Sequence, residues 1–287
     1  MSAFTAKLRL YWPLIKSWQT ALLLSTGMTG YLSASHAPLH WGIFLDLCAS
    51  LFLAISGSTV LNMWYDRDID AKMKRTCSRP LSKGLVTPGE VLRLGLVLSC
   101  LGVGWAVFIS PSYGLVVFAG LFIDVIVYTL WLKRLTAWSI VWGGISGGMP
   151  ILAGRVLAVG HIDWIGMLLM LAVLFWIPTH ILTFNMRYFE DYQAAGVPTF
   201  PSVYGFDATR KIIAASSLLA ALAMGSAAVW IGTTAGALRL MVVLSSGLLL
   251  LALTTWMRPS EKINFGLFKY ASLFMLCSML VLAFGTG

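Results

Sequence analysis

The strongest constraint on this chain is a repeated pattern of apolar runs, each about twenty residues long, separated by polar segments. A helix needs roughly 20 apolar residues to cross a bilayer core about 30 Å thick. Only 11% of the 287 residues are charged, whereas a soluble domain carries about a quarter. We therefore expect an all-α, polytopic membrane protein with one integral-membrane domain over residues 1–287. The nine expected spans are 14–33, 40–61, 91–109, 113–131, 138–158, 163–186, 210–231, 237–257 and 267–285.

The basic residues are divided unevenly between the two sides of the expected bundle. With the N-terminus in the cytoplasm, all but two of the 20 Lys and Arg residues fall in cytoplasmic segments, and the exceptions are Arg155 and Arg239. This is the positive-inside pattern of a protein in the cytoplasmic (inner) membrane of a cell, and it places the C-terminus outside. The positive-inside distribution of a protein in a lipid bilayer thus accounts for the net charge of +9, and we expect no nucleic-acid partner.

The long cytoplasmic connection after the second span concentrates acidic residues. Asn62, Asp66 and Asp70 are spaced four residues apart, which places them on one face if the helix continues past the span. This line of oxygen donors suits Mg²⁺, which binds through one or two carboxylates together with substrate phosphates. Asp68 is out of phase, and we expect it to pair with a neighbouring cation. The alternative is an ordinary loop whose acids balance nearby basic residues.

Basic residues near these acids indicate what a metal ion would carry. Arginine offers two parallel N–H donors to a phosphate, and lysine offers a point charge. A metal, several cations and a large apolar chamber together suggest an isoprenyl diphosphate, whose leaving group must be neutralised as it departs. The candidate diphosphate-binding residues are Lys72, Arg75, Arg79, Lys133 and Arg134.

Several motifs have a familiar arrangement. An Asn-x-x-x-Asp-x-x-x-Asp pattern closes the second span, and a second acidic loop follows the sixth. These features resemble the UbiA superfamily of intramembrane prenyltransferases. Three stretches are similar to its protohaem IX farnesyltransferase (haem O synthase) branch: DRDIDAKMKRTCSRPL (66–81), YTLWLKRLTAWSIVWGGISGGMP (128–150) and EDYQAAGVPTFPSVYG (190–205). The resemblance implies the UbiA-type fold, with nine transmembrane helices around a central cavity that opens to the cytoplasm.

The resemblance also implies roles for individual residues. Asn62, Asp66 and Asp70 would form the first metal–diphosphate motif, and Glu190 and Asp191 would stand in the second. His180 matches a histidine of the haem branch and would contact haem or act in acid–base chemistry. The implied catalytic residues are Asn62, Asp66, Asp70, His180 and Asp191; the metal-binding residues are Asn62, Asp66, Asp70, Glu190 and Asp191; the diphosphate-binding residues are Lys72, Arg75, Lys133 and Arg134.

The implied reaction transfers a farnesyl group from farnesyl diphosphate to a vinyl group of haem B. Mg²⁺ would be the cofactor, and haem B a substrate rather than a cofactor. Addition of water would complete haem O, which supplies haem–copper terminal oxidases. Beyond the two substrates and the lipid bilayer, haem A synthase and oxidase assembly proteins are the candidate partners that the resemblance implies.

Two departures from the haem branch concern the acceptor. The branch has Lys-Pro-Arg at the start of its first span, where this chain has Lys16, Ser17 and Trp18. It also has Pro directly before its histidine, where this chain has Thr179. A UbiA-type prenyltransferase acting on a quinone precursor, a chlorophyll-type molecule or an archaeal lipid therefore stays open as an alternative.

Three further polar residues lie within the expected spans, where they are costly unless partnered. Asp46, Asp124 and His180 would be the proton relay of a coupled transporter, a reading that leaves the acidic loops unexplained. His180 alone would also serve as a hydrogen-bonding residue between helices. Asp124 stands shortly before Lys133, and we expect it to support that cationic group.

Overall fold

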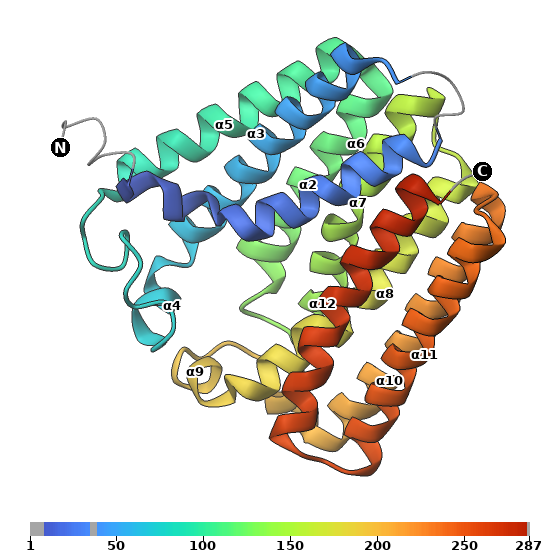
Figure 1. Cartoon of the computed structure of the whole chain (residues 1–287). Coiled ribbons are helices and arrows are strands. Elements are labelled where there is room, and N and C mark those ends of the chain that lie inside the picture. The colour runs from blue at the N-terminus through green and yellow to red at the C-terminus, as the bar shows by residue number, and fades with distance from the viewer. Residues whose placement is uncertain (1–8, 35–38, 286–287) are drawn as a thin grey trace.

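Long helices make up most of the computed structural model, which describes residues 9–34 and 39–285 (Figure 1). They are α2 (Ser17–Leu32), α3 (Trp41–Tyr65), α5 (Pro88–Ile109), α6 (Pro111–Phe122), α7 (Ser139–Val159), α8 (Trp164–Arg187), α10 (Phe200–Ile231), α11 (Ala235–Met257) and α12 (Glu261–Phe284). The short helices are η1 (Trp12–Ile15), α4 (Arg67–Lys72) and α9 (Phe189–Ala194). α6 runs directly into a π-helix, η2 (Ile123–Leu132).

The helices confirm an all-α membrane protein. Among the described residues, eight helices are long and apolar enough to cross a membrane, with α6 and η2 counted as one span. The ninth long helix, α2, has only 16 residues, so it is shorter than the span expected over 14–33. α10 begins at Phe200, earlier than expected, because the chain bends at Gly205 (φ 81°) and is helical on both sides of the bend.

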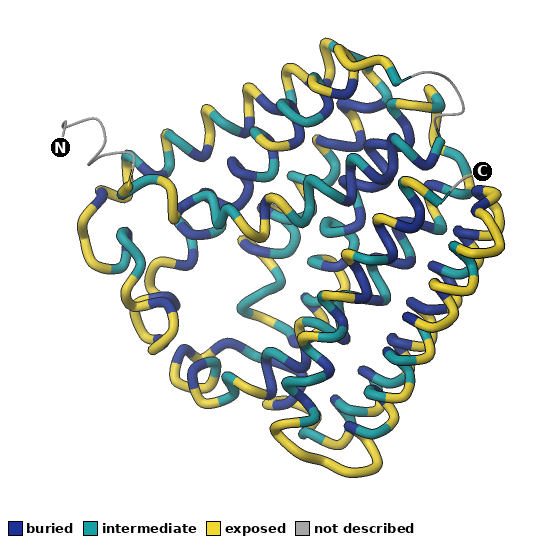
Figure 2. The backbone as a smooth tube through the Cα atoms, in the orientation of Figure 1, coloured by how far each residue is buried: buried dark blue, intermediate teal, exposed yellow. Residues whose placement is uncertain are grey.

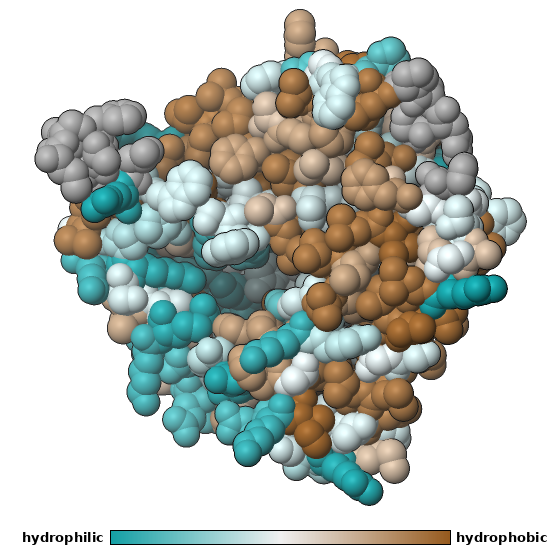
Figure 3. Space-filling view, viewed as in Figure 1, coloured by the Kyte–Doolittle hydropathy of each residue, from teal (hydrophilic) through white to brown (hydrophobic). Residues whose placement is uncertain are grey.

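The outward faces of the bundle are strongly apolar. α5 and α11 lie at its edges, and only 22% of the apolar stretch in each is buried. Figure 2 shows exposed residues running along both helices, and Figure 3 shows broad hydrophobic areas on the surface. The side chain of Phe108 in α5 is 90% exposed and that of Val243 in α11 is 65% exposed. Apolar surface of this extent marks a region that contacts lipid.

The two largest apolar cores among the described residues each join several long helices. One joins α8, α10, α11 and α12 around fully buried residues such as Met224 and Phe274. The other joins α2, α3, α6 and α7 around residues such as Leu47 and Tyr113, which are also fully buried. α3 belongs to the second core, and its C-terminal end carries the first acidic motif.

Glycines permit the closest contacts between helices. A Cβ atom added at Gly154 of α7 would lie 1.9 Å from the carbonyl oxygen of Gly27 in α2. A Cβ atom added at Gly102 of α5 would lie 2.3 Å from the backbone nitrogen of Ala54 in α3. Such backbone-to-backbone contact is typical of helix packing in membranes. It fixes α3 firmly against α5, and so it fixes the helix that ends in the acidic motif.

The short helices α4 and α9 lie near each other at one end of the bundle (Figure 1). A small apolar cluster joins them, in which Ile69 and Met73 pack with Tyr192, Ala195 and Val197. The connection after α3 and the connection after α8 therefore form one structure, although they are far apart in the sequence. Figure 3 shows a hollow bordered by hydrophilic side chains on this side of the molecule.

Candidate active site

The acidic face at the end of α3 continues across a break in the helix. α3 ends at Tyr65 and α4 begins at Arg67. The backbone N–H of Asp66 nevertheless donates to the Asn62 carbonyl at 2.9 Å, and that of Asp70 donates to the Asp66 carbonyl at 2.8 Å. The four-residue spacing therefore stays helical, and the three side chains fall on one face. Asp66 and Asp70 are each only 6% exposed.

Each of these carboxylates is paired with a cation from elsewhere in the chain. Lys133, directly after η2, is bonded to Asp66, and a guanidinium nitrogen of Arg79 lies 2.5 Å from Asp70 Oδ2. Burial disfavours the charged form of Lys133, but Tyr128 and Asp66 outweigh it and raise the pKa of Lys133. The second Asp66 oxygen, Oδ1, is buried and has no hydrogen-bond partner in the described part of the chain. Asp66 thus keeps one oxygen for a further cation.

Asp68 is engaged outside this face. Its two oxygens accept hydrogen bonds from Arg134 at 2.7 and 2.8 Å, and the Asp68 side chain is 54% exposed. The hydrogen bonds from Arg134 lower the pKa of Asp68. The prediction that Asp68 pairs with a neighbouring cation is confirmed. Arg134, predicted to bind diphosphate, is therefore bonded to Asp68 here rather than to the acidic face.

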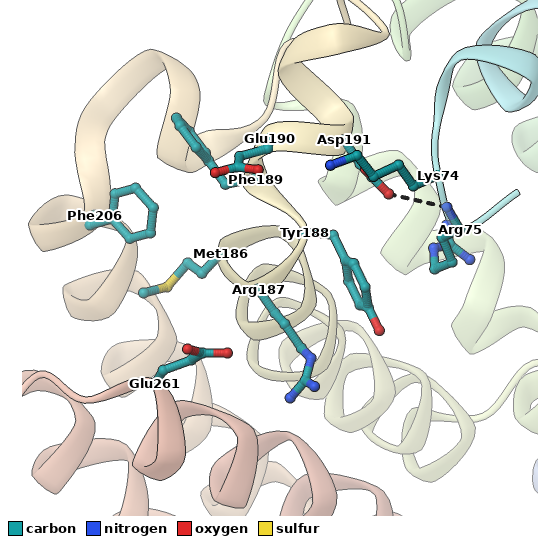
Figure 4. A pocket seen from close by; sticks show the side chains of 10 residues that line it. All are labelled: Lys74, Arg75, Met186, Arg187, Tyr188, Phe189, Glu190, Asp191, Phe206 and Glu261. Carbon is teal, nitrogen blue, oxygen red and sulfur yellow. Dashed lines mark hydrogen bonds between the residues drawn. The ribbon is translucent and has the colours of Figure 1, made fainter.

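The second acidic loop meets the first through Asp191. Asp191 is 9% exposed, and its Oδ2 accepts a hydrogen bond of 3.3 Å from the backbone N–H of Arg75 (Figure 4). The Arg75 guanidinium lies 4.9 Å from the ring centroid of Phe184 and 5.7 Å from that of Tyr188. The structure thus brings Asp191 and Arg75 together, while Glu190 is exposed.

A cavity of about 690 Å³ opens beside the second acidic loop. Figure 4 shows that Glu190 and Asp191 line it from α9, and that Arg75 lines it from the connection after α4. Arg187, at the end of α8, lines it too. Lys72 at the end of α4 is exposed, and no ion pair among the described residues includes it. The predicted cations thus differ in their surroundings: Lys133 is paired with the acidic face, Arg75 faces the cavity, and Lys72 points to solvent.

His180 is held by two aromatic rings and a serine. Its ring stacks between Trp176, at a centroid distance of 4.8 Å, and Phe268 of α12, at 4.4 Å. Its Nδ1 atom lies 3.2 Å from the hydroxyl oxygen of Ser272. None of the hydrogen bonds found in the described ranges joins His180 to either acidic loop. The partners found for His180 are thus aromatic rings and Ser272 rather than the candidate metal ligands.

Sequence reasoning did not place Lys16 or Ser58 beside the acidic face. Lys16, between η1 and α2, has a φ of 43°, and within the described ranges it alone of the non-glycine residues has a positive φ. Burial, and then the nearby Arg79 and Lys133, lower the pKa of Lys16 to about 8. Ser58, four residues before Asn62, extends the same helical face, and that spacing was the available signal. The expectation for Asp124 is wrong: it accepts hydrogen bonds from Ser58 and Asn62, not from Lys133.

Oxygen donors make the acidic face suitable for Mg²⁺. Within residues 9–34 and 39–285, no group of three or more His, Cys, Asp or Glu side chains is placed to hold a metal. Asp66 and Asp70 nevertheless offer two carboxylates, Asn62 offers an amide oxygen, and Asp66 Oδ1 lacks a partner. Mg²⁺ that arrives with phosphate oxygens needs only one or two protein carboxylates. The residues present therefore fit a magnesium–diphosphate group.

Relatives of this chain are found among curated proteins. A protohaem IX farnesyltransferase from Archaeoglobus fulgidus is 42% identical over 219 residues, which are 76% of this chain and 76% of that protein. A protohaem IX farnesyltransferase from Ruegeria pomeroyi is 38% identical in an alignment of 278 residues that covers 92% of this chain and 86% of that protein. Both matches extend over most of the chain.

Solved structures and a family description agree on the fold. A digeranylgeranylglyceryl phosphate synthase structure matches with a TM-score of 0.81 at 19% identity, covering 98% of both chains. A UbiA homologue from Archaeoglobus fulgidus bound to GPP and Mg²⁺ matches with a TM-score of 0.67 at 17% identity, covering 96% of this chain and 99% of that one. Residues 23–281 match the description of the UbiA prenyltransferase family. This chain belongs to the UbiA prenyltransferase family.

Proposed function

We propose that this protein transfers the farnesyl group of farnesyl diphosphate to a vinyl group of haem B, which yields haem O and diphosphate. The bond between the farnesyl carbon and the diphosphate oxygen breaks, and its electron pair leaves with diphosphate. The π electrons of the vinyl group form the new carbon–carbon bond. Water then captures the resulting cation and loses a proton, which leaves the hydroxyl group of haem O. The curated relatives that support this acceptor are 38% to 42% identical to this chain.

The observation that carries the proposal is the pairing of acids with cations at the end of α3. In the structure, Lys133 is bonded to Asp66 and Arg79 to Asp70. A magnesium–diphosphate group would provide new partners for both members of each pair, because the carboxylates can bind the metal and the cations can bind phosphate oxygens. Lys133 and Arg79 would then stabilise the negative charge that develops on the departing diphosphate.

Other residues complete this binding site in the proposal. Asn62, Asp66 and Asp70 would hold one side of the metal centre, and Asp191 with Glu190 would hold the other. Bound Mg²⁺ would supply Lewis-acid stabilisation of the leaving group. The supporting observations are the buried, unpartnered Asp66 Oδ1 and the hydrogen bond that ties Asp191 to the Arg75 backbone. Arg75 would bind diphosphate, with Lys72 and Arg134 at the exposed rim.

His180 is the residue that we assign to the acceptor. Its Nδ1 is engaged with Ser272, so Nε2 is the nitrogen left for a ligand. The buried ring of Trp176 and the partly buried ring of Phe268 stack on the two faces of the imidazole, so they fix the plane in which this nitrogen is presented. Apolar helices around the chamber would also keep water away from the allylic cation until the carbon–carbon bond has formed.

We further propose that the protein lies in the cytoplasmic membrane with its N-terminus in the cytoplasm and its C-terminus outside. The uneven division of Lys and Arg residues supports this orientation. It places α4, α9 and the acidic face on the cytoplasmic side, where a soluble diphosphate product would be released. Haem A synthase and oxidase assembly proteins remain the candidate partners.

Product identification tests the proposal directly. Purified protein is supplied with Mg²⁺, farnesyl diphosphate and either haem B or an aromatic quinone precursor. The masses of the extracted products are then measured by mass spectrometry. We expect haem O only in the reaction with haem B. Prenylation of the aromatic acceptor without farnesylated haem would refute haem B as the acceptor but would still support prenyl transfer.

The same preparation distinguishes an enzyme from a transporter. Diphosphate release that requires Mg²⁺ and disappears in Asp66→Ala and in Asp70→Ala is the result expected of the enzyme. Gradient-driven flux through reconstituted vesicles that survives both substitutions would indicate a transporter instead.

A further inference from the structure

Asp124 forms an unusual hydrogen-bond network one turn below the acidic face. Its Oδ2 accepts a hydrogen bond of 2.5 Å from Ser58 Oγ and one of 2.9 Å from Asn62 Nδ2. Ser58 and Asn62 belong to α3, whereas Asp124 belongs to η2, so the network joins two spans. A carboxylate inside a span is costly, and it is retained where it serves a purpose.

The network fixes the orientation of the Asn62 side chain. A carboxylate only accepts hydrogen bonds, so the amide nitrogen of Asn62 must face Asp124. At the other end of the amide, Thr129 Oγ1 donates to Asn62 Oδ1 at 2.8 Å. Thr129 is 1% exposed, so this contact is sheltered from water. Both ends of the amide are therefore held, and one lone pair of Oδ1 remains for another ligand.

The π-helix explains how one segment reaches both ends of the amide. Asp124 and Thr129 are five residues apart, and in an α-helix such residues point about 140° away from each other. In a π-helix, hydrogen bonds join residues i and i+5, so these residues lie one turn apart on the same side. The bond of 2.8 Å from the Lys133 N–H to the Tyr128 carbonyl shows this spacing at the end of η2. π-helical turns occur frequently at functional sites.

We propose that Asp124 and Thr129 are positioning residues that hold the Asn62 amide oxygen in place as a ligand of the metal–diphosphate group. The inference rests on the proposed function, because it concerns the same metal site. Asp124 does not touch the substrate: it acts through Asn62, whose oxygen lies on the helical face shared with Asp66 and Asp70. Removing such an outer partner typically weakens metal affinity by about 10–100-fold.

The test measures metal binding without turnover and without haem. Mn²⁺ replaces Mg²⁺, inorganic diphosphate is the phosphate probe, and free Mn²⁺ is counted by electron paramagnetic resonance in detergent-solubilised, full-length protein. We expect Asp124→Leu to weaken Mn²⁺ binding by about 10–100-fold. Thr129→Val should weaken it in the same direction but by less, and Thr129→Ser, which keeps the hydroxyl group, should restore it.

Ser146→Ala is the matched control. Ser146 Oγ lies 3.4 Å from the other Asp124 oxygen and already donates to the Gly143 carbonyl at 2.9 Å, so its loss should change Mn²⁺ affinity by less than about twofold. Thr129→Val is nearly isosteric, so it keeps the inference testable if Asp124→Leu does not fold. Wild-type affinity in folded Thr129→Val and Asp124→Leu would overturn the inference and leave the proposed function intact. If the wild-type protein bound no Mn²⁺ in the presence of diphosphate, both this inference and the proposed function would be refuted.

Discussion

The pair formed by Asp66 and Lys133 allows the stability and the function of the site to be separated. The Asp66 side chain is 8% exposed and that of Lys133 is 21% exposed, so each charge depends on the other. Removing one partner of a buried pair leaves an uncompensated charge and costs about 3–5 kcal/mol. Because Lys133 retains some contact with solvent, we expect Asp66→Asn to cost about 3 kcal/mol, the lower end of that range. Lys133→Met, which strands the more buried carboxylate, should cost as much or more.

The double variant Asp66→Asn with Lys133→Met should recover most of this loss. Replacing both members of a buried pair is often close to neutral, so we expect a stability within about 1 kcal/mol of wild type. Unfolding is followed by tryptophan fluorescence during titration of mixed micelles with sodium dodecyl sulfate, since the chain has 12 Trp residues. Diphosphate release is measured on the same samples, and it should be lost in all three variants.

Additivity would refute this reasoning. If the two single losses summed to the loss of the double variant within about 0.5 kcal/mol, the two residues would not be coupled. A double variant with normal diphosphate release would also contradict the roles proposed for both side chains.

Three further predictions concern individual positions. Gly102→Ala should destabilise the protein by about 1–3 kcal/mol through overpacking against α3. Gly104→Ala in the same helix should be neutral or stabilising, because an added Cβ atom there meets nothing within 4 Å. Unfolding in detergent compares the stabilities of the two variants. Asp68→Asn should cost less than about 1 kcal/mol because its pair with Arg134 is exposed. The folded-state pKa of Asp68 lies below its unfolded value. The stability contributed by the Asp68–Arg134 pair is therefore present above about pH 4 and fades as the pH falls through the folded-state pKa. The free energy of unfolding lost in Asp68→Asn should thus be larger at pH 7 than at low pH. Lys16→Gly should be more stable than Lys16→Ala by about 1 kcal/mol, because only glycine adopts a φ of 43° without strain; equal stabilities would contradict the left-handed backbone.

The membrane spans could be predicted from the sequence because a bilayer imposes a length and a composition on every helix that crosses it. The acidic face of Asn62, Asp66 and Asp70 could be predicted because it depends on helical spacing alone. The pairing of Asp68 with a cation followed from the same spacing, since Asp68 points away from that face. Each of these features is local in the chain, so neighbouring residues are enough to define it.

Features that depend on contacts between distant segments could not be predicted in this way. The partner of Asp66 is Lys133, and choosing it over the other basic residues requires the packing of η2 against α3. Nothing in the residues Ile123–Leu132 distinguishes a π-helix from an α-helix, so the contacts that Asp124 and Thr129 both make with Asn62 could not be predicted. His180 likewise lies between Trp176 and Phe268, and the second of these rings comes from a helix more than eighty residues later in the chain.

The apolar contact between α4 and α9 has a consequence for the kinetics of the proposed reaction. Because Ile69 and Met73 pack with Tyr192, Ala195 and Val197, the two acidic loops cannot separate without exposing this cluster to water. The two acidic loops should therefore move together, with one rate constant, rather than independently of each other. A substitution that weakens the cluster, such as Ile69→Ala, would then accelerate binding and release on both loops at once, although it touches no charged residue.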